Sequence, residues 1–206
     1  MRPYAERLLP WMMEKVLSRP VYAEQRRSLL RRAAGRALEI GFGFGGTLAE
    51  YPGARVREVV ALEPNPGMLR RARPRIARAP FPVRFVRGVA EAMPFMPGSF
   101  DTVVSNWTLC SLKRLPDALR EIRRVLAPSG SFLFLEHGLS EEPRLARWQH
   151  LLTPVQQVLA DGCRLDLDVE AVIRSAGFRI ESIERYESGP PVRVLRQMYR
   201  GVARPA

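Results

Sequence analysis

Cysteine, histidine and lysine are scarce in this chain of 206 residues, which contains two of each. The two cysteines, Cys110 and Cys163, supply neither a disulfide framework nor the ligand spacing of a metal site. We therefore expect no metal ion, and a reducing, intracellular compartment such as the cytoplasm.

Long apolar runs are also absent. No stretch approaches the roughly 20 apolar residues that a bilayer-spanning helix needs. Residues 1–20 carry charges throughout and lack the apolar core of a signal peptide. The sequence shows no zinc-ligand spacing, arginine–glycine repeat or motif of stacking aromatic residues, so we expect no sequence-specific nucleic acid partner.

The charge is strongly positive. The formal net charge is +12 at pH 7, and arginine supplies nearly all of the positive charge because Lys15 and Lys113 are the only lysines. Two explanations stay open, namely an arginine-rich composition without functional meaning and attraction to anionic partners such as lipid head groups. Peripheral contact with an anionic membrane is therefore one expectation.

Residues 1–35 have the pattern of a helical extension or lid. Apolar residues recur at helical spacing on one face, with arginines beside them: Ala5, Leu8, Leu9, Met12, Met13, Val16 and Leu17. Pro10 interrupts this pattern, so we expect the helix to begin there, with proline in its first turn. A second helix is predicted over residues 21–34, and residues 36–206 form one domain with a full core.

From residue 36 onward, strand and helix patterns alternate. Strands are predicted over 36–41, 58–63, 83–88, 100–106, 131–138 and 178–186, with a seventh in the C-terminal tail. Helices are predicted over 67–79, 115–126 and 167–177. Alternation with short connections predicts an α/β domain in which helices cover both faces of a parallel sheet.

The stretch "LEIGFGFGG" follows the first strand and is rich in glycine. Gly41, Gly43 and Gly46 allow a sharp turn and leave room for a ligand beside the backbone. Ligands of open α/β sheets bind beyond the carboxyl ends of the strands, and a helix opening near Thr47 would offer its N–H groups there. The same spacing, followed by Glu63, also fits a dinucleotide site, so an NAD(P)-dependent oxidoreductase stays an alternative.

Glu39 favours a different ligand. A carboxylate at the end of the first strand disfavours a pyrophosphate but suits the ammonium and sulfonium groups of S-adenosylmethionine. With this acid, "LEIGFGFGG" resembles the first motif of the class I S-adenosylmethionine-dependent methyltransferases. "LEPNPGML", "VRGVAEAMPFMPGSFDTVVSN", "VLAPSGSFLFLEHG" and "IRSAGFRIESIE" resemble the motifs that follow it, so the resemblance covers about residues 36–204.

The resemblance implies a Rossmann-like three-layer fold, whose mostly parallel seven-stranded sheet has an antiparallel last strand. It also implies S-adenosylmethionine as cofactor, with Glu63 on the ribose hydroxyls and Met68 facing the adenine. The cofactor-binding residues expected in this way are Glu39, Gly41, Phe42, Gly43, Gly45, Glu63, Pro64, Met68, Ala90, Glu91 and Asn106.

One position departs from the family pattern. Val89 stands where related methyltransferases often have an aspartate that binds the adenine amino group. We therefore expect the adenine contact to come from the backbone near Ala90, from Glu91 or from water.

The acceptor is expected beyond the fourth and fifth strands, near Ser105, Asn106, Trp107 and His137. We predict His137 as the general base, because a neutral imidazole accepts a proton at physiological pH. Glu136 or Asp161 is a candidate to orient its ring. The other histidine, His150, has the pattern of a helix-surface residue, and Cys163 that of a small buried residue rather than a nucleophile.

The acceptor class follows from a closer resemblance. "SNWT" lacks the Pro-Pro pair of amide and adenine methyltransferases, which disfavours those substrates. The sequence has no Pro-Cys dipeptide, which disfavours methylation of cytosine C5. It also has no carboxylate cluster of the kind that a magnesium-dependent catechol site needs. "TLCSL", "LEHG" and "ADGCRL" resemble the subgroup with thiol S-methyltransferases and phospholipid-type N-methyltransferases. We expect methyl transfer to a small, apolar or lipid-like thiol, amine or hydroxyl, with a non-catalytic cofactor-binding protein as a further alternative.

Overall fold

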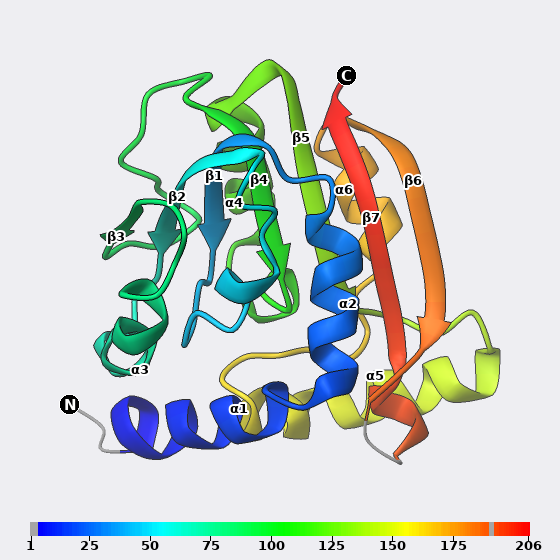
Figure 1. Ribbon diagram of the computed structural model, residues 1–206. Helices are drawn as coiled ribbons and strands as arrows, with labels where there is room; N and C mark the ends of the chain where they lie inside the picture. Colours follow the sequence, from blue (N-terminus) through cyan, green and yellow to red (C-terminus); the bar gives the residue numbers. More distant parts are fainter. Residues whose placement is uncertain (1–3, 190–191) are drawn as a thin grey trace.

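The computed structural model describes residues 4–189 and 192–206. Residues 1–3, which begin the expected N-terminal extension, lie outside the described residues. One seven-stranded sheet has the order β3-β2-β1-β4-β5-β7-β6 (Figure 1). Its strands are β1 (Gly35–Ile40), β2 (Val56–Leu62), β3 (Val83–Val86), β4 (Phe100–Asn106), β5 (Leu126–His137), β6 (Phe178–Glu187) and β7 (Gln197–Pro205).

Helices fill the segments between the strands. The α-helices are α1 (Leu9–Leu17), α2 (Pro20–Leu30), α3 (Pro66–Ile76), α4 (Leu115–Val125), α5 (Pro143–Leu159) and α6 (Val169–Ser175). The short helical turns are η1 (Tyr4–Leu8), η2 (Leu48–Glu50), η3 (Leu109–Ser111) and η4 (Arg193–Leu195). Pro10 lies in the first turn of α1, as its sequence predicts.

The strand pairing confirms the predicted Rossmann-like fold. Strands β1 to β5 pair in parallel, whereas β7 runs antiparallel between β5 and β6. Strand β5 starts at Leu126 rather than at residue 131 as predicted, because Leu126 already pairs with Phe100 ahead of an irregularity in the register.

Alternate residues of each central strand enter two separate cores. Leu38 and Ile40 of β1 pack with α4 and α6 on one face of the sheet. Ala37 of β1 packs with α2 and α3 on the other face, where Leu29 and Leu30 of α2 are buried. This alternation is the period of two that a strand covered on both faces requires, and it makes α2 a layer of the fold.

The prediction of a helix that begins near Thr47 is wrong. Only the three-residue turn η2 follows the glycine-rich loop. Tyr51 is extended, with φ −68° and ψ 136°, because the next residue is Pro52 and a residue before proline avoids the helical region. The loop therefore lacks the long helix dipole expected there.

The carboxyl ends of the parallel strands form the functional edge of the sheet. Figure 1 shows both α1 and α5 beyond this edge, with α1 below β1, β2 and β4 and most of α5 below β7 and β6. Within the described residues, no helix combines the length and the apolar character that crossing a membrane requires. The two helices at this edge are instead positioned to bound a site.

Candidate functional site

A cavity of about 220 Å³ lies beyond the carboxyl ends of β1, β2 and β4. The residues expected from the sequence that line it are Gly41, Gly43, Glu63, Pro64, Met68, Ala90, Glu91, Trp107 and Asp161. Sequence reasoning missed Met13, Leu62, Asn65, Gly88, Thr108, Ser111, Leu112 and Ala160, and it named Val89 only as a departure. Most of the missed residues are small or apolar and carry no chemical signature of a site.

Two glycines of the loop have different tasks. Gly41 has φ +60°, and a Cβ there would collide with the side chain of Thr108. Gly43 has φ +59°, but its Cβ would meet only the carbonyl oxygen of Gly41, at 3.8 Å. Gly41 therefore lets the turn after β4 approach β1, whereas Gly43 leaves open space in the cavity wall.

Glu63 connects the end of β2 to this loop. Its carboxylate accepts the backbone N–H of Gly43 at 2.9 Å and the N–H of Asn65 at 2.8 Å. The side chain is buried, and burial raises the pKa of its carboxyl group against the lowering effect of these hydrogen bonds. A carboxylate held in this way has a fixed orientation at the cavity wall.

Trp107 is both a core residue and a wall of the cavity. It has φ 53°, a conformation that non-glycine residues rarely adopt. Tyr22 of α2 meets its ring edge-on at 5.2 Å, and the guanidinium of Arg26 lies 5.2 Å from its centre. Helix α2 therefore supports the indole from behind.

Glu136 organises the turn that follows Trp107. It is fully buried, and its Oε1 accepts the hydroxyl of Ser105 and the backbone N–H groups of Thr108 and Leu109. Burial raises the pKa of Glu136 to about 7. This residue was predicted only as an orienting neighbour of His137, yet it fixes the backbone of η3 and with it Ser111 on the cavity wall.

Besides Asn106, three expected cofactor residues in the described part of the chain lie behind the cavity wall. Glu39 is buried and accepts hydrogen bonds from the hydroxyls of Thr47 and Tyr51 at 2.8 and 3.0 Å. Burial raises the pKa of Glu39 to about 7. Phe42 is buried in the core on the α2 side, and Gly45 packs against its ring. In the described part of the chain, none of the three is among the cavity-lining residues.

Of the three predicted catalytic residues, all within the described part of the chain, one lines the cavity. Asp161 is exposed and lines the cavity. Asn106 and His137 end β4 and β5, and neither is among the described residues that line it. Burial lowers the pKa of His137 to about 4, so its ring is neutral at physiological pH.

His137 instead lies beside the two cysteines. The Sγ atoms of Cys110 and Cys163 are 3.3 Å apart, and both side chains are buried. The other histidine, His150, is exposed on α5 and pairs with Asp166 at 3.0 Å, as expected of a helix-surface residue.

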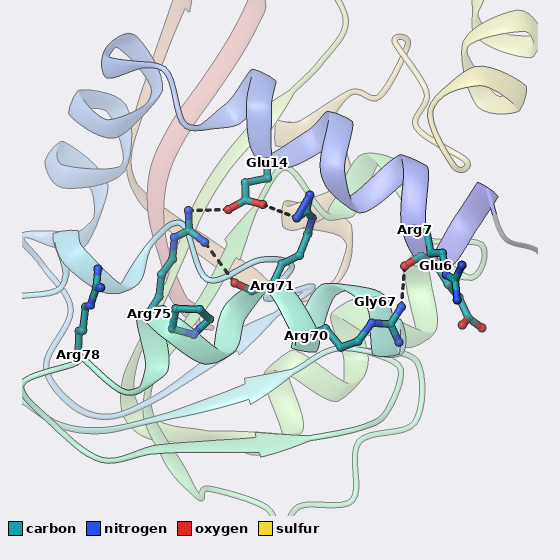
Figure 2. A pocket seen from close by; sticks show the side chains of 9 residues that line it. Glu6, Arg7, Glu14, Gly67, Arg70, Arg71, Arg75 and Arg78 are labelled. Carbon is teal, nitrogen blue, oxygen red and sulfur yellow. Dashed lines mark hydrogen bonds and ion pairs between the residues drawn. The ribbon is translucent and has the colours of Figure 1, made fainter.

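A second cavity, of about 660 Å³, lies between α1 and α3 and is lined by arginine (Figure 2). Glu14 of α1 pairs with Arg71 and Arg75 of α3 at 3.2 and 2.8 Å. The backbone oxygen of Glu6 accepts a hydrogen bond from Arg70 at 2.9 Å. These contacts fix α1 against α3, and Met13 of the same helix lines the first cavity.

Known proteins share this sequence pattern. A family model described as a methyltransferase domain matches residues 38–134. Human thiol S-methyltransferase TMT1A is 37% identical over 146 residues, covering 68% of this chain and 59% of that protein. Human thiol S-methyltransferase TMT1B is 34% identical over 173 residues, covering 81% of this chain and 69% of that protein. The chain thus spans about three fifths to two thirds of the length of these relatives.

A solved structure shares the fold. The S-adenosylmethionine-dependent methyltransferase from Thermotoga maritima, described as a possible histamine N-methyltransferase, superimposes with a TM-score of 0.71 at 19% identity. The match covers 98% of each chain. This likeness shows the fold, and the sequence relatives show that the chain belongs to the class I S-adenosylmethionine-dependent methyltransferases, with S-adenosylmethionine as its cofactor.

Proposed function

We propose that this protein transfers the methyl group of S-adenosylmethionine to a small thiol. The observation that carries the proposal is the cavity that joins the glycine loop, Glu63 and the turn after β4. The thiol S-methyltransferase relatives favour sulfur among the acceptors left open by the sequence.

The residues present suit this cofactor. Glu63 offers a fixed carboxylate for the ribose hydroxyls, and charge-assisted hydrogen bonds of this kind are strong. The open space at Gly43 suits the methionine portion, while Met68 and Ala90 offer apolar surface to the adenine. S-adenosylmethionine supplies an electrophilic methyl group on a sulfonium, so the protein has to align the acceptor and exclude water.

The lining of the cavity favours an acceptor that loses its proton without a strong general base. Among the described lining residues, none is histidine, lysine or tyrosine, and Glu63, Glu91 and Asp161 are the titratable groups. A thiol, with a pKa near roughly 8.5, is already partly deprotonated to the nucleophilic thiolate at neutral pH, whereas an amine near roughly 10 is almost entirely protonated and has no free lone pair. Asp161 is exposed and is the predicted catalytic residue best situated to orient the acceptor.

Helix α1 of the N-terminal extension and the turn after α5 serve as a lid in this proposal, whereas α2 is part of the sheet's cover. Met13 of α1 and Ala160 of the turn after α5 both line the cavity, so the two segments at the functional edge bound it from outside. Closing them over a bound acceptor would exclude water from the reaction.

Apolar acceptors could reach the cavity from a lipid surface. Trp11, Met12 and Val16 of α1 are exposed, as are Leu151, Val155 and Val158 of α5, and both helices lie across the same edge (Figure 1). Of the apolar face expected for α1, the side chains of Ala5 and Leu9 lie outside the described residues. These exposed faces support peripheral contact with an anionic membrane next to the site.

Ligand-induced thermal shift tests the cofactor half of the proposal. S-adenosylhomocysteine at a hundredfold excess over its dissociation constant should raise Tm by on the order of 5–10 °C. NAD and NADP should leave Tm unchanged. A shift with NAD or NADP alone would favour the oxidoreductase alternative. A shift with S-adenosylhomocysteine but no turnover of any acceptor would favour a non-catalytic binding protein.

A further inference from the structure

Three side chains that bind soft metal ions converge beside the cavity. Cys110 comes from η3, His137 ends β5, and Cys163 lies in the loop after α5. One potential ligand atom from each lies within 4.8 Å of the other two, and in the described part of the chain this is the one such group of three. The two cysteines are 53 residues apart in sequence, so their spacing gives no metal motif.

The ligand set has the chemistry of a zinc site. Two thiolates and one imidazole form a common three-residue set for zinc, in which the fourth position stays open for water or substrate. Cys110 is 1% exposed and Cys163 is 7% exposed. The Nδ1 atom of His137 is buried and has no hydrogen-bond partner within the described residues. A buried nitrogen of this kind calls for an explanation, which a bound cation supplies.

The separation of the sulfurs fits a shared cation. Two sulfurs that each lie about 2.3 Å from one tetrahedral zinc ion are about 3.8 Å apart. The observed 3.3 Å requires only a small adjustment from that arrangement. A disulfide would bring the same atoms to about 2.0 Å and would require a larger one.

The backbone around the cluster is held by hydrogen bonds. The N–H of Arg164 donates to the carbonyl of Cys110 at 2.9 Å, which joins the two cysteine segments. Glu136 accepts the N–H of Leu109 and precedes His137 in β5. Two thiolates beside a buried carboxylate would concentrate negative charge, and a divalent cation would compensate it.

The cluster is connected to the cavity wall through neighbouring residues of the chain, although none of its three side chains is among the described residues that line the cavity. Ser111, which follows Cys110, lines the cavity wall, and so does Asp161, two residues before Cys163. A cation bound to the cluster would therefore lie next to the space proposed for the acceptor.

We infer that Cys110, Cys163 and His137 form a site for zinc or a similar thiophilic cation, which receives the sulfur of the acceptor thiol in its fourth position. The inference deepens the proposed function and rests on it for the identity of the acceptor. On binding, the acceptor S–H releases its proton to solvent, and the sulfur replaces a water molecule on the cation. That sulfur then bonds to the methyl carbon, while the bond from the methyl carbon to the sulfonium breaks and leaves its electron pair on the departing sulfur.

Cobalt(II) is the probe for this site, because it takes the geometry of zinc and absorbs visible light. Metal-free, reduced protein is titrated with cobalt, without cofactor or acceptor. One equivalent should produce tetrahedral visible bands and a sulfur-to-cobalt charge-transfer band, and zinc should displace it. Absence of the charge-transfer band in the wild-type protein overturns the inference, as does quantitative formation of a Cys110–Cys163 disulfide that zinc fails to prevent.

Matched variants assign the ligands. Cys110→Ala, Cys163→Ala and His137→Gln should each weaken cobalt binding by at least about 100-fold, the upper end of the loss seen when a ligand's supporting partner is removed. His150→Ala, which changes the exposed histidine, should bind cobalt as the wild type does. Thermal unfolding of each metal-free variant identifies any variant that fails to fold. If a variant fails to fold, the cobalt titration of the wild-type protein alone decides whether the metal site exists. Wild-type cobalt affinity in folded cysteine variants contradicts the inference.

Adding a small thiol to the cobalt-loaded protein tests the open position. The visible bands should shift on thiol addition and stay unchanged with the corresponding alcohol. Unchanged bands with the thiol overturn the role of the cation in acceptor binding. Thiol methylation at full rate by metal-free protein overturns it as well, yet leaves the proposed function standing. Failure to methylate any thiol removes the proposed acceptor, whereas the cobalt spectra decide the metal site independently.

Discussion

The carboxylate of Glu63 accepts the backbone N–H of Gly43 at 2.9 Å, so one hydrogen bond joins the end of β2 to the loop after β1. The same carboxylate accepts the N–H of Asn65. This acid of the cavity wall therefore shapes the loop after β1.

Replacing Glu63 with glutamine should weaken S-adenosylhomocysteine binding by roughly 10- to 100-fold, because a hydrogen bond to a charged group contributes about 1.5–3 kcal/mol. Isothermal titration calorimetry measures this loss. Glu58→Gln is a matched control, because Glu58 lies on β2, which ends just before Glu63, but pairs with Arg36 away from the cavity. Equal affinities for the two variants would remove Glu63 from the cofactor site.

Gly43→Ala and Gly98→Ala separate backbone strain from ligand binding. Both glycines have positive φ, +59° and +66°, and a new Cβ would meet only the carbonyl oxygen of Gly41, at 3.8 Å, in the first and no atom within 4 Å in the second. Each alanine should therefore cost about 1–2 kcal/mol of unfolding free energy. Only Gly43→Ala, and more strongly Gly43→Val, should also weaken cofactor binding. Comparable cofactor affinity in both alanine variants would show that Gly43 does not face the ligand.

Glu39 should make the protein less stable as pH rises. Burial raises its pKa from 4.5 to about 7, so the folded state keeps a proton that the unfolded chain has released. Stability from this group is full below about pH 4.5, falls as pH rises toward 7 and is level above that, with a total change of about 3 kcal/mol.

Denaturant unfolding between pH 4.5 and 8 measures this effect in wild type and Glu39→Gln. The decline in unfolding free energy with rising pH should be smaller in Glu39→Gln than in wild type. Part of the decline should remain in both proteins, because the pKa of Glu136 is also raised to about 7. Glu24→Gln on the exposed face of α2 should behave as wild type. An identical decline in the Glu39 variant would show that this carboxyl group is ionised in the folded protein near neutral pH.

Anionic vesicles test the exposed faces of α1 and α5. Wild type should co-sediment with them at low salt, less so at high salt. Trp11→Ser combined with Val158→Ser should reduce binding by at least about tenfold, since each large apolar side chain contributes about 1.5–3 kcal/mol when buried. Met96→Ser removes an equally exposed apolar side chain near the amino end of β4, at the opposite edge, and should bind like wild type. No binding by wild type at low salt would contradict membrane contact.

The sequence predicted the elements that depend on local pattern. The strands, the glycine loop and Glu63 could be assigned because each is specified by adjacent residues. The cluster of Cys110, His137 and Cys163 could not, because it depends on how η3, β5 and the loop after α5 meet. The partners of Glu39 were missed for a similar reason, since Pro52 shortens the expected helix and turns Thr47 and Tyr51 back toward the strand.

The most direct measurement is methyl transfer from S-adenosylmethionine carrying a deuterated methyl group. Three acceptors with the same short alkyl chain, ending in a thiol, an amine or a hydroxyl, are compared by mass spectrometry of their products. The labelled thioether should form together with S-adenosylhomocysteine, at least about tenfold faster than the labelled amine or ether, because at neutral pH the thiol alone is appreciably deprotonated to its nucleophilic form. A labelled amine or ether as the main product, or no labelled product from a protein that binds S-adenosylhomocysteine, would contradict the proposed thiol methyltransferase.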